Sequence, residues 1–191
     1  MIRITAGVYR GRQIKSPADK AIRPTTSRVR ESVFARIQFE LPDARFLDCF
    51  SGSGLMGIEA VSRGAGFVMA VEKQLPHVKL IEANYQQLKV SLDRYQVLRY
   101  DVDKLLSQPP KEIVAPFQFV YMDPPYGYPA AQALVHNLLQ NGWLASEGKI
   151  LLEQGRSDER IEAIEGMSSE QYAIQYLDYG DTRVTLISIQ T

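Results

Sequence analysis

From residue 45 onward the sequence alternates between short apolar runs and stretches with helical periodicity. The apolar runs lie at residues 46–50, 67–71 and 95–100, and the helical stretches between them at residues 55–63 and 75–88. A strand, a helix and a second strand in this order usually connect parallel neighbours, because a short turn cannot join parallel strands. The alternation therefore predicts an α/β fold, with a parallel sheet and helices on both faces.

The rest of the chain continues this pattern and then leaves it. Further elements are predicted as a short helix at residues 102–106, a strand from residue 117, a helix at residues 130–140 and a strand at residues 149–153. The tail has two strand-like runs, residues 171–179 and 182–189, separated by Gly180-Asp181. Two such residues between strands are a strong hairpin signal. The predicted sheet therefore ends in an antiparallel pair.

The first 40 residues differ from this main pattern. Weak alternation around Gly7 and Gly11 predicts a short curved hairpin, and hydroxyls at Thr25-Thr26-Ser27 predict the cap of a helix at residues 28–37. A chain of 191 residues fits one domain, or one domain with a small appendage. We predict an appended basic hairpin and helix at 1–40 and a main domain at 41–191.

Cysteine, histidine and the lengths of apolar segments bear on compartment and metal binding. The single cysteine, Cys49, lies at a predicted strand end and is expected to be a small buried apolar residue. His77 and His136 have no cysteine or carboxylate cluster at ligand spacing, so no metal site is predicted. The sequence shows neither a signal-peptide core nor an apolar run of about 18 residues, which favours a cytoplasmic protein.

Charge is unevenly distributed along the chain. Residues 1–36 contain nine Lys and Arg and two Asp and Glu, a net charge of plus seven, although the whole chain is neutral. The remainder therefore carries minus seven. A basic arm on an acidic body is typical of a protein that contacts a polyanion through the arm. The alternative is an ordinary solvated surface.

A glycine-rich segment follows the first strand of the repeat and opens a helix. Gly52, Gly54 and Gly57 form a G-x-G-x-x-G pattern, and Glu72 lies at the end of the next strand. Glycines in this pattern followed by an acidic residue are a fingerprint of dinucleotide-binding proteins, so a dinucleotide is one candidate ligand. However, Asp48 stands at the strand tip before the glycines, where a carboxylate repels a pyrophosphate and favours a cationic ligand.

S-adenosylmethionine is the ligand that suits these residues together. Its ammonium and sulfonium groups match the acidic strand tip at Asp48, and its ribose matches Glu72. Asp101 follows the next strand and is placed to accept a hydrogen bond from the adenine amino group, with Val102 covering the ring. The alternative for Asp48 and Asp101 is helix capping, since aspartate is a favoured cap residue.

A second motif ends the strand that starts at Phe117. Asp123-Pro124-Pro125-Tyr126 must lie just past the strand, because a buried strand cannot spare the backbone donors that prolines lack. Asp123 then stands at the carboxyl edge of the sheet, where α/β proteins bind ligands. A rigid turn with Tyr126 packed as a lid is the alternative. As a site, the motif would hold a planar substrate with an amino group.

These motifs resemble the class I S-adenosylmethionine-dependent methyltransferases, and within them the RsmD family of 16S ribosomal RNA guanine-N2 methyltransferases. The resemblance covers nearly the whole chain and is carried by residues 4–12, 23–31, 48–54 and 123–126. The first two segments are the specific ones, because the other two occur across many amino-methylating enzymes. Ser27 stands where the family often has Asp, and it is another capping side chain.

The resemblance implies a Rossmann-like class I methyltransferase fold, with a seven-stranded, mostly parallel sheet whose last strand is antiparallel. It implies S-adenosylmethionine as the cofactor and 16S ribosomal RNA, within the small ribosomal subunit, as the partner. The expected reaction methylates the N2 amino group of guanine 966 in the family's customary RNA numbering. A monomer without metal or membrane partner is expected.

The resemblance also implies that Arg23-Pro24-Thr25-Thr26 folds over the methionine end of the cofactor. The predicted catalytic residues are Asp123, Pro124, Pro125 and Tyr126. The predicted cofactor-binding residues are Arg23, Thr25, Thr26, Asp48, Phe50, Ser51, Gly52, Gly54, Glu72, Lys73, Asp101, Val102 and Asp123. The predicted RNA-binding residues are Arg3, Tyr9, Arg10, Arg12, Lys15, Arg28 and Arg30.

In the predicted mechanism, Asp123 and the Pro124 carbonyl accept the two amino hydrogens of guanine, and Tyr126 stacks on the base. Two other functions remain open. A DNA adenine-N6 methyltransferase uses the same motif on a similar amino group, although such enzymes usually carry an additional target-reading domain. A non-catalytic RNA-binding module on the same fold is the second alternative.

Overall fold

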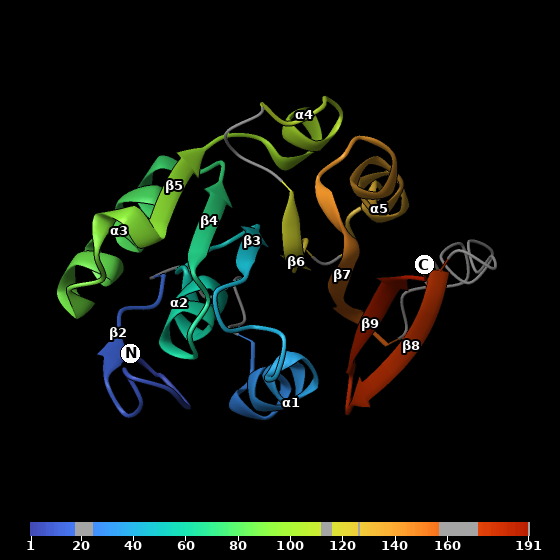
Figure 1. Ribbon diagram of the computed structural model, residues 1–191. Coiled ribbons are helices and arrows are strands. Elements are labelled where there is room, and N and C mark those ends of the chain that lie inside the picture. Colours follow the sequence, from blue (N-terminus) through green and yellow to red (C-terminus); the bar gives the residue numbers. More distant parts are fainter. Residues whose placement is uncertain (18–24, 112–115, 126, 157–171, 191) are drawn as a thin grey trace. The chain divides into compact units, whose positions relative to one another are not determined.

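The computed structural model describes residues 1–17, 25–111, 116–125, 127–156 and 172–190 (Figure 1). The chain divides into two compact units, Met1–Asp101 and Val102–Thr191. The N-terminal 40 residues lie in the same unit as the glycine-rich segment. The boundary expected near residue 40 remains a prediction.

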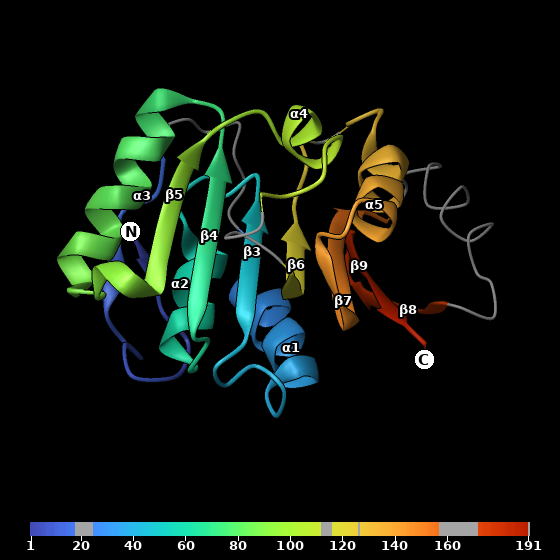
Figure 2. The same ribbon diagram turned by 45° about the horizontal axis from the view of Figure 1, so that its top comes forward.

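The first unit contains three parallel strands in the order β5-β4-β3. They are β3 (Arg45–Cys49), β4 (Phe67–Glu72) and β5 (Tyr95–Arg99), joined by the helices α2 (Leu55–Ser62) and α3 (Leu75–Leu88). Both crossovers step in the same direction across the sheet, so right-handed connections bring both helices to one face. The three strands lie side by side in Figure 2.

Helix α2 is buried along its whole length. The N-terminal segment covers its outer side, because the Val8 N–H donates to the Ser62 carbonyl and the Ser62 hydroxyl donates to the Ala6 carbonyl. That segment contains the antiparallel strands β1 (Ile2–Arg3) and β2 (Gln13–Ile14). The expected hairpin is confirmed, with shorter strands than the sequence pattern indicated.

Helix α1 (Ser27–Ile37) begins where the capping hydroxyls predict. The Thr26 side chain accepts a hydrogen bond from the Val29 N–H, which satisfies one of the unpaired donors of the first turn. Apolar side chains of this helix, including Val33 and Phe34, are buried. In α3, Leu75 at the first position is 41% exposed, whereas Val78 and Ile81 in the same helix are buried.

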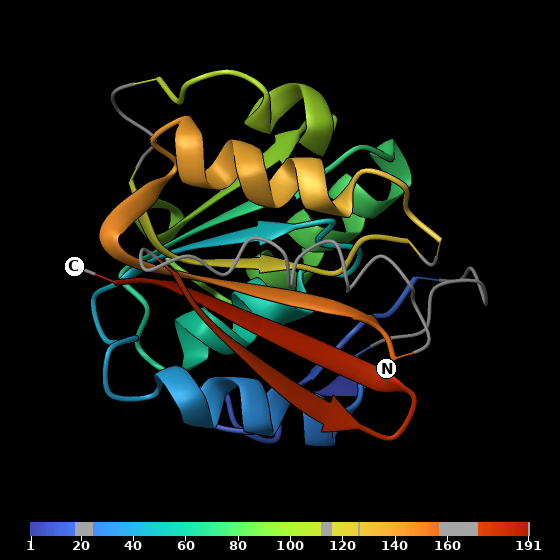
Figure 3. The same ribbon diagram turned by 90° about the vertical axis from the view of Figure 1, so that its right-hand side faces the viewer.

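The second unit contains α4 (Val102–Leu106), β6 (Phe117–Met122), α5 (Ala131–Gln140), β7 (Leu144–Gly155), β8 (Tyr172–Tyr179) and β9 (Thr182–Ile189). Its strand order is β6-β7-β9-β8. Strands β6 and β7 are parallel, whereas β9 is antiparallel to both β7 and β8. Figure 3 shows β7, β9 and β8 side by side, with α5 packed against β7.

Seven strands form the mostly parallel sheet, and its last strand in the sequence is antiparallel. This confirms the fold that the sequence predicts. Two details were not expected: β7 starts at Leu144, earlier than predicted, and a short 3-10 helix (Leu92–Arg94) precedes β5. A register shift between Phe117 and Phe119 accommodates the longer β7 against β6.

Within the described residues, no helix is long and apolar enough to cross a membrane. The same part of the chain holds no group of three or more His, Cys, Asp or Glu side chains arranged to bind a metal ion. Cys49 is buried at the end of β3, as expected.

Candidate functional site

The turn between β3 and α2 is tight. Its residues Phe50, Gly52 and Gly54 have positive φ angles of 59°, 55° and 76°. This region of backbone space is unfavourable for a side chain such as that of Phe50, and strain of this kind concentrates at functional sites. The Ser51 N–H donates to the Val71 carbonyl, 3.1 Å away, so the turn is also fixed to β4.

The glycines of this turn differ in the space around them. A Cβ on Gly52 would meet only the Phe50 carbonyl oxygen, at 4.0 Å. A Cβ on Gly57 would lie 2.5 Å from the Tyr85 hydroxyl, and one on Gly54 would lie 2.9 Å from the Ile81 side chain. Gly52 therefore leaves an open side where a ligand can approach the backbone, whereas Gly54 and Gly57 allow close packing against α3.

Asp48 lies buried beneath this turn, with 1% of its surface exposed. Its Oδ2 accepts a hydrogen bond from the Gly57 N–H, 3.0 Å away in the first turn of α2. This bond satisfies one of the unpaired donors in the first turn of α2, whose N-cap residue is Gly54. Burial raises the pKa of Asp48 to about 7, against hydrogen bonds from Gly57 and Ser51 that lower it, and the nearby Glu72 raises it further.

Glu72 joins the glycine turn to the start of α3. Its Oε2 accepts from the Gly52 N–H at 3.0 Å, and its Oε1 accepts from the Gln74 N–H at 2.8 Å. The side chain is largely buried at the carboxyl end of β4. A carboxylate has about four acceptor positions, so these two bonds are compatible with a further donor such as a ribose hydroxyl.

Two predicted cofactor-binding residues, Lys73 and Asp101, form an ion pair with each other. The Lys73 Nζ lies 2.7 Å from Asp101 Oδ2, and the lysine side chain is 75% exposed. Exposed pairs of this kind contribute little to stability. Val102, which is predicted to cover the adenine ring, begins the second unit and is buried in α4.

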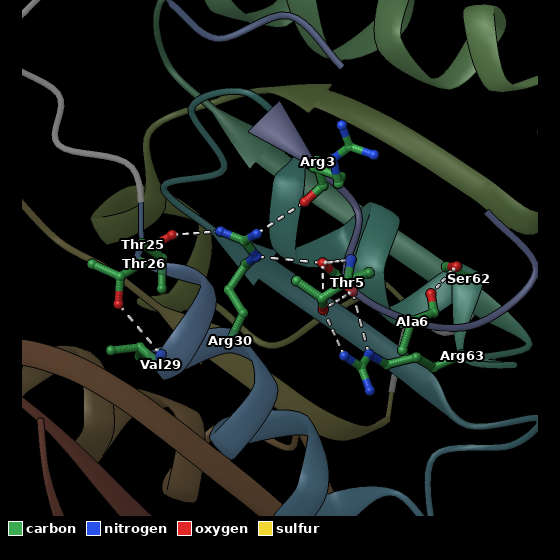
Figure 4. Close-up of polar contacts among 10 residues, drawn as sticks. Arg3, Thr5, Ala6, Thr25, Thr26, Val29, Arg30, Ser62 and Arg63 are labelled. Atoms are coloured by element: carbon green, nitrogen blue, oxygen red, sulfur yellow. Dashed lines mark hydrogen bonds and ion pairs between the residues drawn. The ribbon is translucent and has the colours of Figure 1, made fainter. Parts of the chain in front are cut away.

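The Thr25-Thr26 segment is held by α1. Thr25 is buried and its carbonyl accepts a 2.6 Å hydrogen bond from Arg30, while Thr26 caps the helix (Figure 4). Arg23, which is predicted to contact the cofactor, lies outside the described residues. The role of the segment in cofactor binding remains a prediction.

In the second unit, Asp123 follows β6 directly and is half-buried. Pro124 is buried and Pro125 is exposed, and the Pro125 carbonyl accepts from the Tyr128 N–H at 3.0 Å. The Tyr128 hydroxyl also donates to Asp103 on α4. The motif therefore follows the strand as expected, and a hydrogen-bonded turn holds it. Tyr126 lies outside the described residues.

Most of the predicted RNA-binding side chains are exposed. The side chains of Arg3, Arg10, Arg12, Lys15 and Arg28 are exposed and that of Tyr9 is half-buried. The Arg12 guanidinium donates to the carbonyls of Gln87 and Leu88, the last residues of α3, at 3.0 and 3.2 Å. Cations are favoured at this end of a helix, so Arg12 also anchors the arm.

Arg30 does not belong to this exposed set. It is buried, with 3% of its surface exposed, and forms an ion pair with the fully buried Glu59. A side chain in this position cannot reach a phosphate, so its prediction as an RNA-binding residue is wrong. Arg30 lies three and four residues before Val33 and Phe34, so helical spacing places it on the buried side of α1, and this was the sequence signal for its burial. Its pairing with Glu59 and its contact with the N-terminal segment appear only in the tertiary structure.

A sequence model of the family described as Conserved hypothetical protein 95 matches residues 2–187. The chain is also 36% identical over 152 residues to Ribosomal RNA small subunit methyltransferase D of Escherichia coli, covering 80% of this chain and 74% of the relative. This chain belongs to the RsmD family. The corresponding Haemophilus influenzae protein is 32% identical, with 80% of this chain and 78% of the relative covered.

Solved structures share the fold of this RsmD-family protein. The structure of yhhF from Escherichia coli has a TM-score of 0.83 at 29% identity, covering 100% of this chain and 98% of that one. The SAH-bound Podospora anserina methyltransferase PaMTH1 has a TM-score of 0.67 at 14% identity, covering 87% of this chain and 80% of that one. The second likeness extends only to the fold.

One buried carboxylate of this RsmD-family chain is not among the site residues predicted from the sequence. Glu153, largely buried in β7, accepts a hydrogen bond from the Tyr121 hydroxyl on β6. The register pairs Met122 with Leu152, so the next positions, Asp123 and Glu153, stand at the same end of neighbouring parallel strands. A charged residue directly after the apolar run of β7 was the signal that could have identified it.

Proposed function

We propose that this RsmD-family protein transfers a methyl group from S-adenosylmethionine to the N2 amino group of a guanine in 16S ribosomal RNA. The observation that carries the proposal is the Asp-Pro-Pro sequence at the carboxyl end of β6, in a chain of this family. The relative in Escherichia coli is named a small-subunit ribosomal RNA methyltransferase, which supports the substrate class.

The residues of the first unit fit S-adenosylmethionine. The open side of Gly52 allows the methionine portion to approach the backbone, and Glu72 offers acceptors for the ribose. Asp101 offers an acceptor for the adenine amino group, in place of or beside its ion pair with Lys73. When bound, the cofactor supplies an activated methyl group on a sulfonium. The protein therefore needs mainly to position the reacting atoms.

Asp123 and the Pro124 carbonyl act on the target amine. The N2 nitrogen of guanine is a poor nucleophile because its lone pair is delocalised into the ring. Two acceptors holding its hydrogens favour a pyramidal nitrogen, whose lone pair then points toward the methyl group. The guanine must leave its stack to reach them, which costs a few kcal/mol and less in a loop. Stacking on Tyr126 offsets about 1–3 kcal/mol of this.

The exposed basic arm supports an RNA partner. Arg3, Arg10, Lys15 and Arg28 can contact phosphates, which supply most of the affinity in such interfaces and make it depend on salt. We propose that the arm holds the RNA around the target guanine, within the small ribosomal subunit, and that the protein acts in the cytoplasm.

The deciding experiment compares Asp123→Ala with the wild type. Transfer of tritiated methyl groups is measured on small ribosomal subunits that lack the modification, and cofactor binding is measured by calorimetry. We expect transfer by the variant to fall by at least about 100-fold, the usual contribution of a catalytic group that acts on the reacting atoms, with cofactor affinity nearly unchanged. Full activity of Asp123→Ala would contradict its catalytic assignment.

The same assay separates the alternatives. Transfer to duplex DNA in place of ribosomal subunits would indicate an adenine methyltransferase. RNA binding without affinity for S-adenosylmethionine would indicate a non-catalytic module, and calorimetric binding of NAD would support the dinucleotide alternative.

A further inference from the structure

Arg30 contacts two segments that are distant in the sequence and the residue that precedes the N-cap of its own helix (Figure 4). One terminal nitrogen donates to the Thr25 carbonyl at 2.6 Å, and the other donates to the Arg3 carbonyl at 3.0 Å. Its Nε lies 3.3 Å from Glu59 Oε1 on α2. The guanidinium is thus a planar connector between the N-terminal arm, the start of α1 and helix α2.

Glu59 is the buried carboxylate of α2 with which Arg30 pairs. It is fully buried and also accepts from the Thr5 N–H at 2.8 Å, the Thr5 hydroxyl at 2.9 Å and the Arg63 Nε at 3.3 Å. A buried carboxylate is stable only when it is paired and hydrogen-bonded, and here its partners are all supplied by protein groups. Glu59 therefore holds Arg30 in one orientation relative to α2.

The two carbonyls that Arg30 binds belong to segments with different proposed roles. Thr25 lies in the segment expected to cover the methionine end of the cofactor, and Arg3 lies on the proposed RNA-binding arm. The fork of a guanidinium fixes two acceptors relative to each other, which a single ammonium group cannot do. Both acceptors are main-chain oxygens, so the connection runs through the backbone of each segment.

We propose that Arg30 is a positioning residue for cofactor binding. It acts by holding the backbone at Thr25 against α2, and the same fork aligns the arm at Arg3. This inference rests on the proposed function. It assigns no contact between Arg30 and the cofactor or RNA, because the side chain is buried.

The test uses Arg30→Lys, with Arg63→Lys as the matched control. Both substitutions keep a positive charge near Glu59. Arg63 contacts Glu59 and the Thr5 hydroxyl, whereas it is Arg30 that binds the carbonyls of Thr25 and Arg3. Binding of S-adenosylhomocysteine is measured by calorimetry at a temperature where urea melts show each variant to be folded. Methyl transfer is measured to obtain kcat and the KM for S-adenosylmethionine.

For Arg30→Lys we expect affinity for S-adenosylhomocysteine to fall by about tenfold or more, as for the loss of a hydrogen bond to a charged group. The KM for S-adenosylmethionine should rise while kcat at saturation stays close to that of the wild type. Arg63→Lys should lose stability without this change in affinity. Equal affinity of the Arg30 variant and wild type, or equal losses in both variants, would overturn the inference.

A second variant covers the case in which Arg30→Lys does not fold. Arg30→Met combined with Glu59→Gln removes both charges of the buried pair, and replacing both members is often tolerated. The amide oxygen introduced by Glu59→Gln still accepts from the Thr5 N–H. Weak cofactor binding by this folded variant supports the positioning role, and normal binding overturns it. If the wild type itself fails to bind S-adenosylmethionine, the proposed function fails instead.

Discussion

At the scale of single residues, Asp48 shows how burial changes a carboxyl group. The fold keeps it out of water beneath the glycine turn, where its oxygen accepts a hydrogen bond from the Gly57 N–H in the first turn of α2. Its pKa rises from 3.8 to about 7, chiefly through burial. The folded state therefore holds a proton between about pH 4 and pH 7 that the unfolded chain has already released. Stability falls as pH rises through this window.

Asp48→Asn should remove this pH dependence, because the amide oxygen can still accept from Gly57 and carries no ionisable proton. Between pH 5 and pH 8 the wild type is expected to lose roughly 2–3 kcal/mol of unfolding free energy through Asp48. The variant should lose that much less. Urea denaturation at both pH values measures the difference, with the exposed Asp181→Asn as control. An unchanged pH dependence in Asp48→Asn would contradict the assignment.

Residue type alone was a good guide to motifs and a poor one to exposure. Asp123 and the glycines of the β3–α2 turn could be placed from the sequence, because prolines and positive φ angles leave few backbone choices. Residue type does not distinguish Arg30 from Arg28, but helical spacing does, because Arg30 lies three and four residues before Val33 and Phe34 on the buried face of α1. The contacts of Arg30 to Arg3 and Glu59, which are distant in the chain, could not be read from that spacing.

At the scale of elements, the loop between β1 and β2 is fitted closely to α2. Gly7 and Gly11 have φ angles of 80° and 82°, so a side chain at either position is strained. A Cβ on Gly7 would lie 1.8 Å from the Ser62 carbonyl oxygen, whereas one on Gly11 would meet no atom within 4 Å. The two glycines share a conformation and differ in their surroundings.

Gly7→Ala and Gly11→Ala therefore separate strain from packing. Gly11→Ala should cost only the left-handed backbone, about 1–2 kcal/mol. Gly7→Ala should cost clearly more, because the loop must also move away from the end of α2. Thermal or urea unfolding of both variants measures this. Equal losses of stability would mean that the loop does not depend on its contact with Ser62.

The elements themselves were largely predictable, and their ends less so. Local periodicity determines α4 and β9, whose bounds match the sequence pattern. The early start of β7 depends on pairing with β6, and such pairing cannot be read from one segment.

At the scale of the whole molecule, charge is divided between the N-terminal 36 residues and the acidic remainder. The exposed arginines and lysine of the arm concentrate positive charge on a segment that is anchored to α3 through Arg12. An anchored arm retains its charges in a fixed arrangement. RNA binding by the whole protein should then weaken steeply with salt, although the net charge is zero.

Arg10→Gln tests this without disturbing an anchor, because Arg10 is exposed. Loss of one phosphate contact should weaken RNA binding and reduce the slope of log affinity against log salt by about 0.7–0.9. Lys79→Gln removes one exposed charge from α3 and should leave the slope unchanged. Filter binding between low and moderate salt measures both. The proposed arm is contradicted if the two variants show the same slope.

The position of β9 also has a consequence for how the protein is made. Strand β9 follows β8 in the chain, yet it lies between β7 and β8 in the sheet. While a ribosome is still synthesising β9, β8 has no partner in its final position and the exposed edge of β7 stays open. This part of the molecule therefore cannot finish folding until β9 has been synthesised, and open strand edges are places where nascent chains associate wrongly.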